Sequence, residues 1–202
     1  IVLGFGAGAL MASIAFELWE EGLDLAGPIP LVIGVAAGAI SYYIADRILD
    51  ARAAKAKEKA GGGQLAVGAL LDGIPEQLVL GIGLASGEPV SIALVVAILV
   101  SNLPESIGSA ADLLEGGMAK SRVLLLWAGV AVICAVATVA GFGLASVTGD
   151  EFRAAASGFA AGALLVMLVD SMVPEAQSKA KESTGLVTVL GFALAAGLAL
   201  AS

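Results

Sequence analysis

The sequence predicts an all-α membrane protein that crosses the bilayer several times, and three observations carry that prediction. Hydrophobic residues make up 59% of the 202 residues and charged residues only 14%, with a mean hydropathy of +0.99, far outside the range of soluble globular domains. Seven apolar segments are each long enough to cross a hydrocarbon layer, which takes roughly 20 helical residues. The basic residues gather in alternate separators between these segments.

The seven segments follow one another with short separators. In chain order they are expected near 1–20, 29–49, 64–86, 89–111, 121–147, 153–175 and 184–202. Each is predicted to be a helix because an open strand in lipid would leave backbone groups without partners, and the alternation typical of a β-barrel is not seen. Gly and Pro mark several separators, and the charged run at 50–63 is expected to be a cytoplasmic loop.

The distribution of Lys and Arg gives the orientation. Nine of the ten basic residues lie in or next to three alternate separators: Arg47, Arg52, Lys55, Lys57, Lys59, Lys120, Arg122, Lys179 and Lys181. By the positive-inside rule these separators face the cytoplasm. We therefore expect one multi-pass domain, 1–202, in the cytoplasmic (inner) cell membrane, with the C-terminus outside. The net charge of −8 argues against a nucleic-acid partner and leaves the lipid bilayer as the expected one.

An internal repeat is visible at the two ends of the chain. Residues 4–22 align without a gap with residues 158–176, and both copies read Gly-Phe-x-Ala-Gly-Ala-Leu. The two copies are expected to cross the membrane in opposite directions, as inverted repeats of secondary transporters do. A full apolar segment precedes the second copy and none precedes the first, so we expect one helix to be missing before Ile1. The predicted plan is three helices, a central pair and three helices, with boundaries 1–49 (incomplete first repeat), 64–111 (central pair) and 121–202 (second, inverted repeat).

Glycines recur within the copies and the helices that follow them. In membrane helices small residues let two backbones approach closely. We therefore expect close packing of helices at Gly4, Gly8, Gly34, Gly38, Gly158 and Gly162.

The central pair carries prolines and carboxylates inside apolar sequence. Pro75 and Pro104 are each followed directly by a glutamate. A proline inside a helix cannot donate to the carbonyl four residues back, so each proline is expected to kink its helix and to free one backbone oxygen. A carboxylate in mid-membrane costs on the order of 2.5–3.5 kcal/mol on insertion scales, which favours a function for these acids.

Spacing places the polar side chains of the central pair on two helical faces. Asp72 and Glu76 stand four residues apart on one helix, and Asn102 and Glu105 stand three apart on the other. Ser101 lies four residues before Glu105. Two such helices could direct several oxygen atoms toward one point.

The two motifs resemble those of the ZIP (Zrt/Irt-like protein) family of divalent-metal transporters. The stretch DGIPEQ at 72–77 is similar to the family's His-Asn-x-Pro-Glu-Gly, and SNLPESIGS at 101–109 is similar to His-Glu-x-Pro-His-Glu-Ile-Gly-Asp. The Gly-Phe-x-Ala-Gly-Ala-Leu copies resemble the family's second and seventh helices. The resemblance covers nearly the whole chain and is that of a prokaryotic member without histidine.

The resemblance implies a divalent-cation transporter that works by alternating access through a midplane site, and a homodimer. Its metal ligands would be Asp72, Glu76, Asn102, Glu105 and Ser101. Asp72 and Ser101 stand where the family usually has histidines, so the site would be built of oxygen alone. Oxygen ligands suit Mn²⁺, Mg²⁺ or Ca²⁺ better than Zn²⁺, and Fe²⁺ stays open too. No cofactor is expected beyond the transported ion.

Further acidic residues could line a path to this site or simply meet water near helix ends. They are Asp112, Asp170, Glu175, Glu17 and Glu21. Asp112 could extend an exit path or end its helix.

Two alternatives stay open: a proton-coupled transporter of a non-metal solute, whose carboxylates relay protons, and a non-transporting relative of the family. An enzyme is not expected, because no Ser-His pair or histidine-held metal-bound water can be built without histidine.

Overall fold

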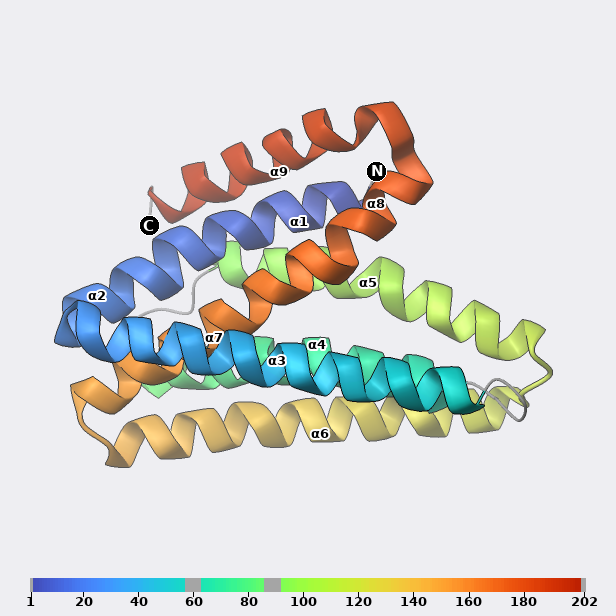
Figure 1. Cartoon of the computed structure of the whole chain (residues 1–202), viewed down its shortest axis with the longest axis horizontal. Coiled ribbons are helices and arrows are strands. Elements are labelled where there is room, and N and C mark those ends of the chain that lie inside the picture. The colour runs from blue at the N-terminus through green and yellow to red at the C-terminus, as the bar shows by residue number, and fades with distance from the viewer. Residues whose placement is uncertain (1, 57–62, 86–91, 201–202) are drawn as a thin grey trace.

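Figure 1 shows the computed structural model, which describes residues 2–56, 63–85 and 92–200. All regular structure within these ranges is helical, so the all-α prediction is confirmed. The α-helices are α1 (Val2–Ser13), α2 (Glu20–Ala26), α3 (Pro28–Ala56), α4 (Gly63–Ala85), α5 (Ile92–Glu115), α6 (Lys120–Val147), α7 (Asp150–Met167), α8 (Val173–Ala180) and α9 (Thr184–Ala199). Two π-helices, η1 (Ile14–Trp19) and η2 (Leu168–Met172), and the 3₁₀ turn η3 (Lys181–Ser183) join some of them.

Several helices extend beyond the apolar segments that predicted them. The helix predicted near 1–20 continues through η1 and α2 to Ala26, and α3 continues to Ala56, into the segment expected to be a loop. Helix α5 reaches Glu115, so Asp112 lies inside the helix and does not end it. Charged residues such as Lys and Arg are good helix formers, so a helix can continue where its apolar pattern stops.

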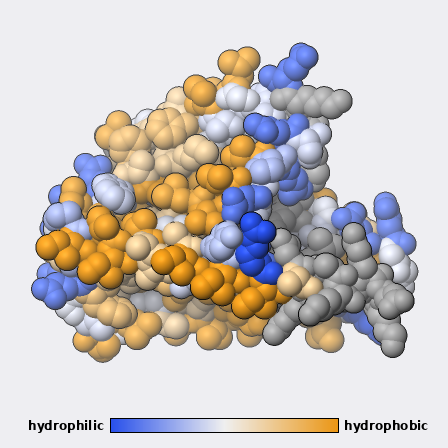
Figure 2. Space-filling model, viewed as in Figure 1, coloured by the Kyte–Doolittle hydropathy of each residue, from blue (hydrophilic) through white to orange (hydrophobic). Residues whose placement is uncertain are grey.

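Four of the described helices are long and apolar enough to cross a membrane. They are Val2–Ala26, Pro28–Ile48, Lys120–Val147 and Asp150–Ser178, and the shorter Thr184–Ala199 is also apolar. Large apolar side chains stand exposed along α3 and α6, including Ile33 and Val136, and Figure 2 shows hydrophobic residues over much of the visible face. A surface of this kind is the one expected of a multi-pass membrane protein.

The long helices pack in three pairs: α1 lies along α9, α3 along α7, and α4 along α6 (Figure 1). Glycines let these pairs approach closely. A Cβ on Gly8 of α1 would lie 1.8 Å from the carbonyl oxygen of Thr188 in α9, and one on Gly38 of α3 would lie 1.8 Å from that of Phe159 in α7. Between α4 and α6, a Cβ on Gly81 would lie 2.0 Å from a backbone oxygen.

Five of the six glycines predicted to be close-packing positions have this role. A Cβ would lie 2.0 Å from the nearest backbone oxygen at Gly34, 2.3 Å at Gly158 and 2.1 Å at Gly162, in addition to the short approaches at Gly8 and Gly38. Gly4 is different, because its nearest neighbour would be at an ordinary 3.5 Å.

The core lies where the segments Val2–Ala26 and Asp150–Ala180 cross, through contacts of η1 with α7 and of α1 with η2, and α5 packs against α1. Leu10 of α1 and Leu164 of α7 are buried there, together with Ile98 of α5. Both crossing helices change to π-helix just beyond these leucines, at Ile14 and Leu168, and these two positions align in the repeat. The local geometry of the two sequence copies is therefore alike.

Helix α5 ends in a glycine-dependent cap that sets the turn into α6. Gly117 has φ of 88°, a left-handed conformation that glycine adopts without strain. The N–H of Met118 donates to the oxygen of Leu113 at 3.0 Å, and the N–H of Gly117 to that of Leu114 at 3.0 Å, the pair of bonds of a Schellman motif. Only residues 116–119 separate the two helices.

Candidate functional site

The site begins with Glu76, a buried carboxylate on α4. Its side chain is 1% exposed, and it is the only acidic residue in the buried class among the side chains that the structure describes. The amide nitrogen of Asn102, on α5, donates to Oε2 of Glu76 and also to the carbonyl oxygen of Ile98, at 2.9 Å. The amide thus joins the two central helices and uses both of its N–H groups.

Local sequence explains how α4 presents this carboxylate. The helix continues through Pro75, which is buried beside Glu76. Proline removes one backbone donor from the helix, but the apolar residues around it keep the segment helical against α6. On α5, Asn102 is partly buried and bonds back to the preceding turn, which fixes the orientation of its amide.

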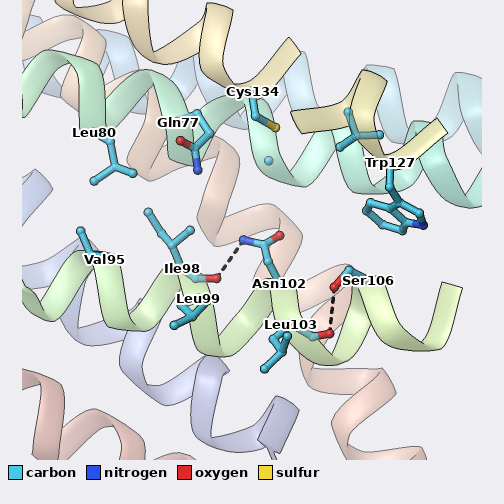
Figure 3. Close-up of a pocket in the computed structure, with 12 residues that line it drawn as sticks. Gln77, Leu80, Val95, Ile98, Leu99, Asn102, Leu103, Ser106, Trp127 and Cys134 are labelled. Atoms are coloured by element: carbon cyan, nitrogen blue, oxygen red, sulfur yellow. Dashed lines mark hydrogen bonds between the residues drawn. The ribbon is translucent and has the colours of Figure 1, made fainter. Parts of the chain in front are cut away.

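A cavity of about 390 Å³ lies between α4, α5 and α6, and Asn102 of this pair lines it. Figure 3 shows Gln77 of α4 and Asn102 of α5 extending toward one another across it, with Cys134 and Trp127 of α6 along one side. Ser106 of α5 also lines it, and the remaining lining is apolar apart from Gly73.

Helix α6 takes part in the site through a hydroxyl and a thiol. The hydroxyl of Thr138 lies 3.0 Å from Oε1 of Gln77 and 3.2 Å from the carbonyl oxygen of Cys134. The Thr138 hydroxyl therefore connects α6 to Gln77 of α4, the residue that follows Glu76. The sulfur of Cys134 would lie 3.1 Å from a Cβ built on Gly73, so the glycine leaves room for the thiol.

The structure brings together two of the five predicted metal ligands, Glu76 and Asn102. The backbones of Asp72, Ser101 and Glu105 belong to α4 and α5, but their side chains lie outside the described residues. Among the side chains that are described, no group of three or more His, Cys, Asp or Glu is arranged to hold a metal ion.

The five predicted path residues occupy different environments. Asp112 on α5 and Asp170 in η2 have exposed side chains. Glu17 in η1, Glu21 on α2 and Glu175 on α8 are partly buried. Four of the five therefore lie on the two repeated segments, Val2–Ala26 and Asp150–Ala180, and only Asp112 lies on the central pair.

Sequence reasoning missed the contribution of α6. Gln77, Trp127, Cys134 and Thr138 were not among the expected site residues, because serine, threonine and cysteine are ordinary in apolar helices. A signal was present: the last three are spaced by seven and then four residues, which places them on one helical face. Nε1 of Trp127 is buried and has no hydrogen-bond partner.

The chain matches no protein-family model, and no curated protein is similar enough to be recognised as a relative.

Proposed function

We propose that this protein transports a divalent metal cation across the cytoplasmic membrane by alternating access, with the cation held between α4 and α5. The observation that carries the proposal is the buried carboxylate of Glu76 with the amide of Asn102 against it. The other proposed ligands are Asp72, Ser101 and Glu105, whose positions in the sequence place them on the same two helices.

The energetics of burial support a charged ligand at this point. An ionised carboxylate is expensive to bury unless another charge or several donors compensate it. A divalent cation bound by carboxylate and amide oxygens would compensate the charge of such a carboxylate. Carboxylate and amide oxygens are hard ligands, which suit Mn²⁺, Mg²⁺ or Ca²⁺.

The proposed architecture is an inverted repeat of seven transmembrane helices around this pair, in a homodimer with the C-terminus outside. Two features support it: the π-helices that begin at the aligned positions Ile14 and Leu168, and the matching pairs of helices, α1 with α9 and α7 with α3. In transporters built this way, substrate sites lie near the midplane, where the repeats meet.

Replacing the buried carboxylate tests the proposal. Glu76→Gln keeps the size and the bond to Asn102 but removes the charge, so Mn²⁺ uptake into proteoliposomes should fall at least tenfold. Glu182→Gln, at an exposed position in η3, is the matched control and should transport as the unmodified protein does. Both variants must elute as folded protein in detergent.

Binding separates metal transport from proton-coupled transport of another solute. Mn²⁺ should raise the melting temperature of the unmodified protein and not that of Glu76→Gln, because a ligand stabilises only the state that binds it. Uptake that survives in Glu76→Gln would refute the site. A melting temperature that Mn²⁺ leaves unchanged in both proteins would favour the proton-coupled alternative.

A further inference from the structure

One side of helix α3 is apolar and exposed along most of its length. Its apolar part, Pro28–Ile48, is one of the segments long and apolar enough to cross a bilayer, and the helix runs along the outside of the molecule (Figure 1). Gly34 and Gly38 bring the other side of α3 against α7. The exposed side, which is the one available to lipid chains, carries Ile33, Ile40, Ile44 and Ile48.

The helix continues for about two turns beyond this apolar part, and the exposed side becomes basic there. Arg47 and Lys55 follow Ile44 by three and by eleven residues, and Arg52 follows Ile48 by four. Each of these spacings returns to the same side of a helix. The side chains of Arg52 and Lys55 lie outside the described residues, so their side of α3 is taken from the register of the backbone.

The acids of this part of α3 are displaced toward the bundle. Asp46 and Asp50 follow Tyr42 by four and by eight residues, and Tyr42 is buried in the core. Both acids therefore lie closer to the side of Tyr42 than to that of Ile44. Asp46 is itself partly buried, whereas Arg47 is exposed. Charges of opposite sign are thus separated around the helix, with the basic side outward.

Arg47 forms a pair with Tyr43 where the apolar part of α3 ends. The guanidinium carbon of Arg47 lies 5.1 Å from the centre of the Tyr43 ring, a cation–π contact, and both side chains are exposed. Tyrosine is enriched where hydrocarbon gives way to lipid headgroups. A guanidinium presents a planar fork of donors that fits a phosphate. The pair therefore combines a phosphate-binding cation with a residue typical of the headgroup level.

We propose that the basic side of α3, formed by Arg47, Arg52 and Lys55, binds the headgroup of an anionic phospholipid of the cytoplasmic leaflet. Arg47, oriented by Tyr43, holds the phosphate, and the other two residues add positive charge further along the helix. Anionic lipids give the cytoplasmic leaflet a negative surface potential that attracts basic segments beside a membrane span. In the orientation proposed above, this is the leaflet that the end of α3 reaches. The bound lipid stabilises α3 and its packing against α7, a property separate from cation transport.

Melting temperatures with added lipid test the proposal. Short-chain phosphatidylglycerol, added to the protein in a neutral detergent, should raise the melting temperature by about 5 °C or more, because a ligand stabilises the state that binds it. Short-chain phosphatidylcholine, which has the phosphate but no net charge, should have little effect. Sodium chloride should reduce the shift, since salt screens exposed charges.

Variants locate the lipid on α3. The combined replacement Arg47→Gln, Arg52→Gln and Lys55→Gln should abolish the shift. Arg47→Lys alone should keep part of it, because the charge remains while the planar fork is lost.

The matched control lies at the turn between α5 and α6. Lys120→Gln with Arg122→Gln also removes exposed basic residues, but the exposed acids Asp112 and Glu115 offset those charges in the unmodified protein. This control should keep most of the shift.

Three results would overturn the inference: no shift in the unmodified protein, a shift that survives the combined replacement, or an equal loss in the control. Inorganic phosphate that raised the melting temperature as much as the lipid does would also overturn it, since the ligand would then be a free anion. If the combined variant does not fold, Arg47→Gln and Arg47→Lys decide. The glutamine variant should show the smaller shift, and equal shifts would refute a role for Arg47.

Discussion

The segments Val2–Ala26 and Asp150–Ala180 share a helical design but differ in their charges. Both change to π-helix at aligned residues, and both approach a neighbouring helix through an aligned glycine, Gly8 or Gly162. Only one pair of their acids aligns, Glu21 with Glu175; Glu17 corresponds to Ser171, and Asp170 to Phe16. The two segments therefore repeat their backbone packing and one acid, while the buried carboxylate of the described residues lies on α4.

The largest loss of stability is expected from adding a side chain at one of the aligned glycines. Gly8→Ala would place a Cβ 1.8 Å from the oxygen of Thr188, and Gly162→Ala would place one 2.1 Å from that of Val35. Helix backbones cannot yield as a flexible side chain does, so each change should destabilise the protein by about 2 kcal/mol or more. Thermal unfolding in detergent would measure the loss.

Two other glycines provide the controls for this pair. A Cβ on Gly4 would meet only ordinary contacts at 3.5 Å, and one on Gly197 would meet nothing within 4 Å. Gly4→Ala and Gly197→Ala should leave the melting temperature nearly unchanged or slightly raised. If Gly8→Ala were as stable as Gly4→Ala, α1 and α9 would not pack as described.

A smaller effect should distinguish the charges of the two segments. One carboxylate oxygen of Glu17 is buried, whereas the side chain of Asp170 is exposed. Glu17→Gln should lower the free energy of unfolding by about 1–2 kcal/mol. The amide that replaces the carboxylate brings N–H donors into buried surroundings, which must rearrange to accept them. Asp170→Asn should change stability by less than about 0.5 kcal/mol, as surface substitutions usually do. Equal losses would mean that burial of the Glu17 oxygen has no effect on stability.

The smallest effect is expected from shortening a π-helix. A π-helix has one more residue per hydrogen-bonded turn than an α-helix, so deletion of the exposed Ala15 should restore α-helical bonding and keep α2 on the same face. The cost should be within about 1 kcal/mol. Deletion of Ala36 in α3 is the control: it rotates the rest of that helix, including Gly38, and should prevent stable folding. Thermal unfolding of both variants, followed by circular dichroism, would show whether the helix can lose Ala15 and remain folded.

Apolar length predicted the all-helical fold with several long apolar helices, and glycine spacing predicted several of the close contacts between them. Hydropathy carries no sign of the π-helices, because one extra residue in a turn leaves the apolar character of Ile14–Trp19 unchanged. A helix boundary set by hydropathy also comes too early in α3, which continues through Arg52 and Lys55, since those residues favour a helix without being apolar.

The site was predictable only in part, for a similar physical reason. Glu76 was found because a charge inside apolar sequence is costly. Thr138 and Cys134 were not, because each is inexpensive in a helix interior and gains its role only from contact with Gln77 and Gly73 on another helix. Contacts of that kind depend on how α4 and α6 are rotated against each other, which spacing within one helix does not determine.

The capped turn between α5 and α6 limits how α5 can move relative to α6. Residues 116–119 are too short to let Glu115 and Lys120 separate far, and the hydrogen bonds at Gly117 and Met118 hold the end of α5 in place. A motion that moves α5 away from α6 must therefore be a rotation about this turn. Displacement would grow with distance from the pivot, so the end of α5 near Ile92 would travel furthest while the spacing of Ser106 and Trp127 changed least.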